Sequence, residues 1–201
     1  MLAANETDRI ELGDDIVRLR PWTPDDLPAL LDAVQSSLGS LGRWLSWCHP
    51  GYDGSDAESY LAQRREEWAC GMQFSFAVLD AATGALIGSA GLSQLNPKHR
   101  SANLGYWIRR SRQGEGLAAH AARHVARFGF GQLGLVRIEV VTMPDNHASR
   151  RTAERIGARF EAIARQRVWS WDKAHDAAVY GLIPADLTPL EGRTPASPTG
   201  A

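Results

Sequence analysis

The sequence is poor in cysteine, has no long apolar run and carries almost no net charge. Its two cysteines, Cys48 and Cys70, lie 22 residues apart without a CxxC spacing, so they frame neither a disulfide scaffold nor a zinc site. No run of 18 apolar residues is present, and the acidic N-terminal segment has no apolar stretch of its own. These absences give no support to a disulfide-rich secreted domain or to membrane insertion. We therefore expect a cytoplasmic protein with reduced thiols, no bound metal and no membrane partner.

The near-zero charge conceals a strong asymmetry along the chain. The 22 basic and 23 acidic residues leave a net charge of -1, yet residues 1–97 sum to -8, residues 98–167 to +9 and the last 34 residues to -2. This distribution predicts an anionic ligand around the basic segment, and the acidic segment favours attraction of a cationic group. The basic segment has no aromatic pattern or recognition helix typical of nucleic-acid binding, so we expect no nucleic-acid partner.

Length and composition are ordinary for a single folded unit. The chain has 201 residues, of which 44% are hydrophobic and 22% charged, and such a chain is long enough to bury a full core. We expect one domain over residues 15–183, a flexible arm over residues 1–14 and a disordered tail over residues 184–201. That tail holds 4 of the 10 prolines.

The order of apolar patterns predicts an α/β fold of the α+β kind. Alternating or continuous apolar runs predict strands at 16–20, 74–80, 85–95, 101–110, 136–142, 159–168 and 176–183. Helical spacing predicts helices over 23–38, 56–70, 116–130 and 147–156. The short turns between the strands of residues 74–110 predict antiparallel neighbours, whereas the strand, helix and strand over 101–142 form a βαβ unit with parallel strands. We expect a mixed, mostly antiparallel sheet, flanked by helices and opened between strands 102–109 and 136–142.

A glycine loop lies between the strand and the helix of this βαβ unit. Gly114 and Gly116 allow the backbone to approach a ligand, and the following helix offers unpaired N–H groups with the positive end of its dipole. Arg109, Arg110 and Arg112 add cationic donors, so the loop predicts a phosphate site. A tight turn with exposed arginines explains the same residues without a ligand.

The same loop also matches a dinucleotide fingerprint in form. Gly114-x-Gly116-x-x-Ala119 fits G-x-G-x-x-G/A, and Glu139 follows about 20 residues later. Polar residues separate the strand from the first glycine, however, and a second βαβ half is missing. The context therefore argues against a nicotinamide cofactor.

Four motifs in order resemble the GNAT superfamily of acetyl-CoA-dependent N-acetyltransferases. Gln113-x-x-Gly116-x-Ala118 resembles its Q/R-x-x-G-x-G/A signature, and the ANLGYWI stretch at 102–108 resembles its central strand. The NHAS and AERIGA stretches at 146–149 and 153–158 resemble the family's N-x-x-S...E-x-x-G-F segment. The WLSW stretch at 44–47 is similar to a tryptophan motif of the RimJ/RimL branch, which acetylates protein N-terminal amines. The likeness covers about residues 15–183.

The resemblance implies an acetyl-CoA site and assigns residues to it. The backbone of 113–118 would hold the pyrophosphate, the backbone of Trp107 and Ile108 would hold the acetyl carbonyl and pantetheine, and Arg109 to Arg112 with Arg150 and Arg151 would meet the remaining phosphate. The full set expected at the cosubstrate is Trp107, Ile108, Arg109, Arg112, Gln113, Gly114, Glu115, Gly116, Leu117, Ala118, Asn146 and Ser149.

The resemblance also suggests the groups that move protons. Ser149 or Tyr106 would protonate the leaving thiolate and Asn146 would bind the pantetheine arm, although Asn146 is equally well explained as a helix N-cap and Tyr106 as a core residue. Asn103 stands where many relatives carry a glutamate, and an amide accepts no proton at neutral pH. Glu139 matches a glutamate proposed as the base in the RimI branch, whereas a solvent-facing strand glutamate and a water relay stay open.

The acceptor expected from the resemblance is a primary amine, above all an N-terminal α-amine of a protein or peptide. Trp44, Trp47, His49 and Asn103 would line its side of the site. A small amine, an aminoacyl nucleotide, or a non-catalytic role as a CoA-binding module stay open, and so do a monomer and a homodimer. His120 and His124 lie one helical turn apart, but without the metalloprotease glutamate they predict a solvated basic face.

Overall fold

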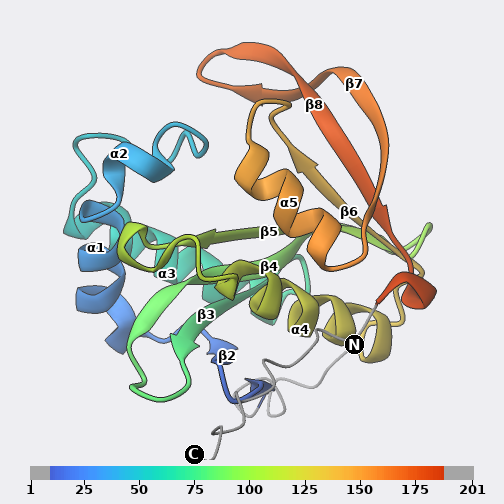
Figure 1. Ribbon diagram of the computed structural model, residues 1–201. Helices are drawn as coiled ribbons and strands as arrows, with labels where there is room; N and C mark the ends of the chain where they lie inside the picture. The colour runs from blue at the N-terminus through green and yellow to red at the C-terminus, as the bar shows by residue number, and fades with distance from the viewer. Residues whose placement is uncertain (1–9, 188–201) are drawn as a thin grey trace, which may run out of the picture.

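A single eight-stranded sheet with helices on both faces forms the body of the molecule (Figure 1). The computed structural model describes residues 10–187. The strands are β1 (Leu12–Gly13), β2 (Val17–Pro21), β3 (Phe74–Asp80), β4 (Leu86–Asn96), β5 (Ser101–Ile108), β6 (Arg137–Thr142), β7 (Arg159–Ser170) and β8 (Lys173–Leu182). The α-helices are α1 (Leu27–Gln35), α2 (Leu38–Leu41), α3 (Gly54–Ala69), α4 (Leu117–Gly131) and α5 (His147–Arg155).

The strands lie in the order β1-β2-β3-β4-β5-β6-β8-β7. Every neighbouring pair is antiparallel except β5 and β6, which run parallel and are joined by α4. A long crossover is required for a parallel pair, and α4 supplies it. The mixed, mostly antiparallel sheet predicted from the sequence is thereby confirmed.

Local chemistry moves several predicted boundaries. The helix predicted over 23–38 is divided into a 3-10 turn at Pro24–Asp26, then α1, then α2. α3 begins two residues earlier than predicted, because Asp53 caps it by accepting hydrogen bonds from the N–H groups of Ser55 and Asp56.

Both ends of the described chain are more ordered than the sequence suggested. Residues 12–13 pair with β2, through Leu12 opposite Leu19, although an arm was expected there. A 3-10 helix at Pro184–Asp186 lies where the tail was expected, and its buried Asp186 forms an ion pair with Arg159 at 2.8 Å. The rest of the expected arm and tail, residues 1–9 and 188–201, lies outside the described residues.

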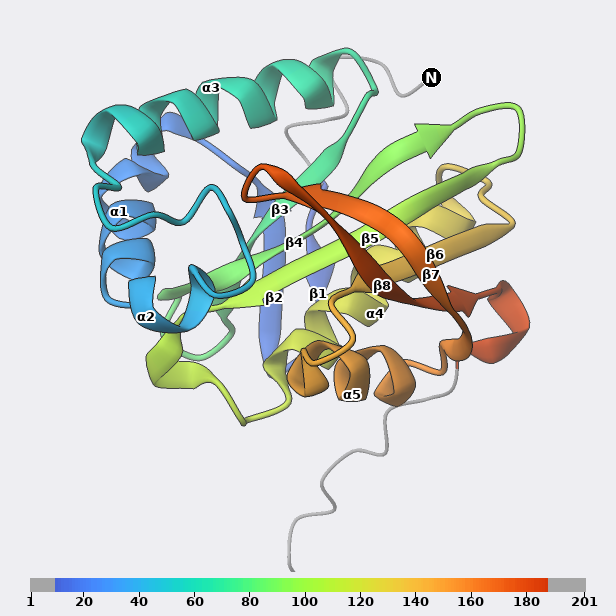
Figure 2. The same cartoon turned by 90° about the horizontal axis from the view of Figure 1, so that it is seen from above.

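Helices cover both faces of the sheet (Figure 2), and an apolar core stabilises each face. The larger packs α4 and α5 against one face, and the smaller packs α1 and α3 against the other, together with Trp22, Tyr52 and Trp107. Trp68, near the end of α3, belongs to the larger core, and its ring centroid lies 4.8 Å from that of Phe76. Burial of these faces holds β5, β6 and α4 in fixed relative positions.

One carboxylate fastens the first strands to α4. Asp14 Oδ1 accepts hydrogen bonds from the N–H groups of Ile16 and Val17, and Asp14 Oδ2 lies 2.9 Å from His120 Nδ1 and 3.1 Å from His124 Nε2. Both imidazoles are largely buried. The prediction of a solvated basic face at His120 and His124 is therefore wrong, because a carboxylate distant in sequence covers them.

Candidate active site

The parallel strand pair opens part way along its length. β5 and β6 are paired only at Ser101 opposite Arg137, Ala102 opposite Ile138 and Asn103 opposite Glu139. Beyond Asn103 the strands separate, and a cavity of about 560 Å³ lies between them, bordered by the start of α4 and by α5. The opening predicted between these two strands is present, and it begins where pairing ends.

Backbone groups of β5 face this gap at alternate residues. The N–H of Arg109 donates to the carbonyl of Ile87 on β4 at 2.8 Å, and in an antiparallel pair such bonded positions recur at every second residue. Trp107 therefore turns its backbone toward Ser89 on β4, its register partner. Tyr106 and Ile108 turn theirs toward the gap. Of the two backbone positions expected to hold the cosubstrate, the geometry favours Ile108, joined by Tyr106, over Trp107.

The glycine loop presents unpaired donors at the end of the gap. Gly114 and Gly116 have φ of +87° and +83°, a conformation that L side chains rarely adopt. Within residues 10–187, the N–H groups of 114–118 have no backbone hydrogen-bond acceptor. Gln113 closes the loop by donating from Nε2 to the carbonyl of Ile108 at 2.8 Å. Five free N–H groups at the positive end of α4 form a site for an anion.

Two of the arginines expected at the phosphate are paired with carboxylates instead. Arg109 donates to Asp32 at 2.8 Å, and Arg112 contacts Asp80 at 3.0 Å and Glu115 at 2.9 Å. Hydrogen bonds from Thr83 and then from Arg112 lower the pKa of Asp80 to about 2. These pairs anchor the loop to α1 and β3, so much of the charge of the two arginines is neutralised within the protein.

A different arginine, Arg155 of α5, lies beside the loop. A Cβ atom placed on Gly116 would be 3.2 Å from Arg155 Nη1. Arg151 and Arg155 both line the cavity, whereas Arg150 donates away from it, to the hydroxyl of Tyr180 and the carbonyl of Pro144. The sequence held a signal for this pair, because residues four apart share one face of a helix.

Tyr106, Ser149 and Asn146 form one hydrogen-bonded cluster on the wall of the cavity. The Tyr106 hydroxyl donates to the carbonyl of Ser149 at 2.9 Å and lies 3.3 Å from Ser149 Oγ. Burial raises the pKa of Tyr106, so the phenol stays protonated at neutral pH. Asn146 Oδ1 accepts from the Ser149 N–H at 3.1 Å as an N-cap, which leaves its amide Nδ2 as a donor for a ligand.

The two candidates for a base have very different surroundings. Asn103 lines the cavity, and its Oδ1 is buried without a hydrogen-bond partner among the described residues. Glu139 does not line it: its carboxylate accepts from Arg137 at 3.0 Å and lies 3.7 Å from Arg167. Glu139 is thus held in an ion-pair network at the last paired position of β6, outside the open part of the gap.

The aromatic residues expected around the acceptor are divided between the site and the core. Trp44 lines the cavity. Trp47 packs among Tyr52, Tyr60 and Trp107, with ring centroids 5.9 to 6.1 Å apart. His49 faces Asp56, with 3.5 Å between Nε2 and Oδ2. Neither Trp47 nor His49 lines the cavity, because the connection after α2 folds back on the smaller core.

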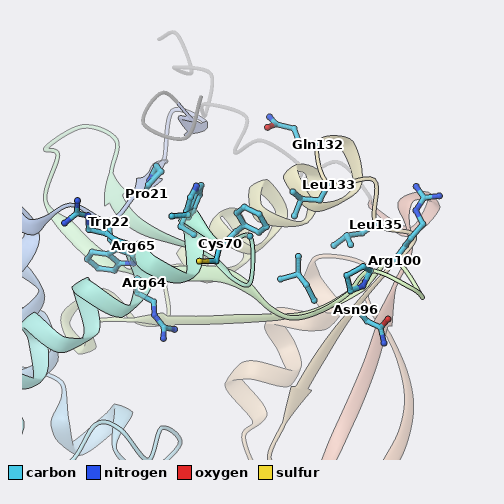
Figure 3. Close-up of a pocket in the computed structure, with 16 residues that line it drawn as sticks. Pro21, Trp22, Arg64, Arg65, Cys70, Asn96, Arg100, Gln132, Leu133 and Leu135 are labelled. Atoms are coloured by element: carbon cyan, nitrogen blue, oxygen red, sulfur yellow. The ribbon is translucent and has the colours of Figure 1, made fainter. Parts of the chain in front are cut away.

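A larger cavity lies at the opposite end of α4 (Figure 3). It measures about 800 Å³ and runs between the ends of α3 and α4. Three arginines and mainly apolar residues line it, without the glycine loop or the tyrosine–serine cluster. Within residues 10–187 no group of three or more histidine, cysteine or carboxylate side chains is suited to a metal ion. None of the described helices is long and apolar enough to cross a membrane.

Comparisons with known proteins agree with this geometry. The model of the acetyltransferase (GNAT) domain family matches residues 17–159. YdaF of Bacillus subtilis, whose name provisionally assigns it ribosomal N-acetyltransferase activity, is 27% identical over 173 residues, which cover 83% of this chain and 91% of YdaF.

Solved structures extend the likeness. A Vibrio cholerae protein, named provisionally as a ribosomal-protein-serine acetyltransferase, superposes with a TM-score of 0.78 at 26% identity, over 89% of this chain and 99% of that one. The ribosomal L7/L12 α-N-protein acetyltransferase RimL, solved with coenzyme A, shares the fold with a TM-score of 0.77 at 19% identity, over 85% of this chain and 95% of RimL. The resemblance seen in the motifs is confirmed: the chain belongs to the GNAT acetyltransferase domain family, in its RimJ/RimL-like branch, and is an acetyl-CoA-dependent N-acetyltransferase.

Proposed function

We propose that this enzyme acetylates an N-terminal α-amine of a protein or peptide. One observation carries the proposal: no aspartate, glutamate or histidine is among the described residues that line the cavity between β5 and β6. Within this cavity an acceptor amine therefore has no carboxylate or imidazole to take its proton, since Asp145 and His175 line the adjoining chamber instead. A substrate whose amine is already neutral in a useful fraction is favoured.

The residues of the gap fit acetyl-CoA. Five free N–H groups at 114–118 and the guanidinium of Arg155 suit a pyrophosphate. The gap-facing amides of Tyr106 and Ile108 would align an extended pantetheine arm, as a neighbouring strand would be aligned, and Asn146 Nδ2 would donate to it. Bound in this way, acetyl-CoA supplies an activated acyl group for transfer to the amine.

The Tyr106–Ser149 cluster would donate a proton to the thiolate of the leaving coenzyme A. The phenol is protonated at neutral pH and touches the Ser149 hydroxyl, so the pair forms a short chain of donors at the cavity wall. On the acceptor side, the unpartnered Oδ1 of Asn103 would accept a hydrogen bond from the incoming amine or from a water that carries its proton away.

Amine basicity favours the α-amine. An α-amino group of pKa near 8 is about 10% neutral at pH 7, whereas a lysine side chain of pKa near 10.4 is only about 0.04% neutral. This difference exceeds a factor of 100. The names of the relatives, which refer to ribosomal proteins and in RimL to an α-N-protein acetyltransferase, support a protein acceptor. A ribosomal acceptor would place the enzyme in the cytoplasm.

The pH dependence of acceptor turnover tests the proposal. With thiol release as the readout, kcat/KM should rise about tenfold per pH unit and level off near the pKa of each amine, so that acceptors of different basicity give displaced profiles. If kcat/KM instead levelled off at the same pH for all acceptors, the titrating group would be a base on the enzyme. Sustained acetylation of lysine side chains with no activity on peptide N-termini would refute the α-amine assignment.

A further inference from the structure

The turn between β7 and β8 holds a tryptophan in an unfavourable backbone conformation. Ser170 pairs with Lys173, and the two residues between them, Trp171 and Asp172, both have positive φ, +48° and +55°. Two-residue hairpins of this kind favour Asn-Gly or Asp-Gly, because bulky side chains are disfavoured at positive φ. A tryptophan at this position suggests a role other than forming the turn.

Trp171 lines a chamber of about 410 Å³ beside the site. The chamber is also lined by Trp44, His175, Lys173 and the exposed ion pair between Arg43 and Asp145. The tip of the hairpin extends over the sheet toward the loop after α2 in both views (Figures 1 and 2). The Trp171 ring packs edge-on against His175, with centroids 5.7 Å apart, and 40% of the residue stays exposed.

The chamber adjoins the cavity between β5 and β6. Trp44 and Met143 line both spaces. An amine that reaches the open strands from this side would leave the rest of its molecule in the chamber. Arg43 already stacks on the ring of Trp44, 4.7 Å from its centroid, so the partly exposed indole of Trp171 is the aromatic surface left for that group. An indole face favours an apolar or aromatic group, and such contacts contribute roughly twofold to tenfold in affinity.

We propose that Trp171 is a specificity-determining residue that contacts the group next to the reacting amine and selects for an apolar or aromatic one. The inference rests on the proposed function, since it requires an α-amine in the adjoining cavity. In this proposal the strained turn between β7 and β8 selects the acceptor, whereas the loop at 114–118 binds acetyl-CoA.

The test compares two α-amines, phenylalanine amide and glycine amide, with three variants. Trp171→Asn removes the ring but suits the positive φ, Trp171→Phe keeps a ring, and Asp172→Asn alters the same turn at a residue outside the chamber. We expect Trp171→Asn to raise KM for phenylalanine amide about fivefold, with KM for glycine amide and for acetyl-CoA unchanged. Trp171→Phe should retain most of the preference, and Asp172→Asn all of it.

Each contrary result has a distinct meaning. An unchanged KM ratio between the two amines in Trp171→Asn overturns the inference. So does a lowered Tm with unchanged KM, which would make Trp171 a packing residue of the hairpin, or an equal effect of Asp172→Asn, which would assign selectivity to the turn. Failure of every variant and of the wild type to acetylate any α-amine would instead refute the proposed function, and the inference with it.

Discussion

The positive charge available at the glycine loop comes from the arginines that are not paired with carboxylates. Arg112 lines the cavity but forms ion pairs with Asp80 and Glu115. These carboxylates neutralise part of its charge and weaken its attraction for a phosphate. Arg155 approaches the loop from α5, next to Gly116. At the scale of residues, the proposed anion site therefore combines backbone donors at the start of one helix with a side chain from another.

Substitution of Arg155 by glutamine should weaken coenzyme A binding about tenfold. Hydrogen bonds between charged partners contribute about 1.5–3 kcal/mol, and each 1.4 kcal/mol corresponds to one factor of ten. Titration calorimetry with coenzyme A measures the change. Arg127→Gln, at an exposed position near the far end of α4, is the matched control and should bind as the wild type does. Equal affinity in Arg155→Gln and wild type would remove this residue from the site.

The position of α4 determines whether the loop and β5 meet correctly. Its N-terminal end follows the glycine loop, and its first turns are bound through His120 and His124 to Asp14. Burial alone would raise the pKa of Asp14, but hydrogen bonds from His120, Val17, His124 and Ile16 lower it well below the usual range. At the scale of elements, an acidic residue before β2 thus helps to hold α4, whose N-terminal end borders the proposed acetyl-CoA site.

Replacement of Asp14 by asparagine should lower the free energy of unfolding by about 1 kcal/mol at pH 7, a modest value because a third of the side chain is exposed. A carboxylate with a lowered folded-state pKa stabilises the fold fully above its unfolded pKa near 4, and this contribution declines below that pH until the folded-state pKa is passed. The difference in Tm between wild type and variant should therefore be constant above about pH 5 and should shrink steadily as the pH is lowered below about 4. Asp15→Asn, at the exposed neighbouring position, should show no such difference. A Tm difference for Asp14→Asn that stays the same down to the most acidic pH at which both proteins fold would contradict the role of the charge.

The basic segment of the sequence places only part of its positive charge at the site cavity. Of the fourteen basic residues between 98 and 167, three line the site cavity: Arg112, Arg151 and Arg155. Others are paired elsewhere, as Arg137 is with Glu161 and Arg159 with Asp186, and Arg100 lines the larger cavity of Figure 3. The expectation that the whole basic segment surrounds the anion is wrong, because strands and helices distribute successive side chains to opposite faces.

Binding in the gap should stabilise the whole fold. A ligand present at 100 times its Kd adds about 2.7 kcal/mol to the free energy of unfolding, which for a domain of this size raises Tm by roughly 5–10 °C. Acetyl-CoA should produce this shift in a thermal melt. NADPH should not, since the antiparallel strands before β5 offer no second dinucleotide-binding half. A comparable shift with NADPH would reopen the dinucleotide interpretation.

Local sequence determined most of the elements and the loop between β5 and α4. Gly114 and Gly116 signal a backbone that only glycine adopts easily, and the apolar periods signal strands and helices, so both were predicted without tertiary information. The motifs also determined the family, because they occur in order along one chain.

Only the tertiary structure decided which side chains face the gap. Register on β4 turns the backbone of Tyr106 and Ile108, rather than Trp107, toward the gap, and packing places Trp47 in the core and Glu139 in an ion-pair network. Asp14 on His120 and Arg155 beside Gly116 join residues far apart in sequence. Such contacts depend on how the sheet and helices pack, and a local sequence pattern does not specify which distant residue will be the partner.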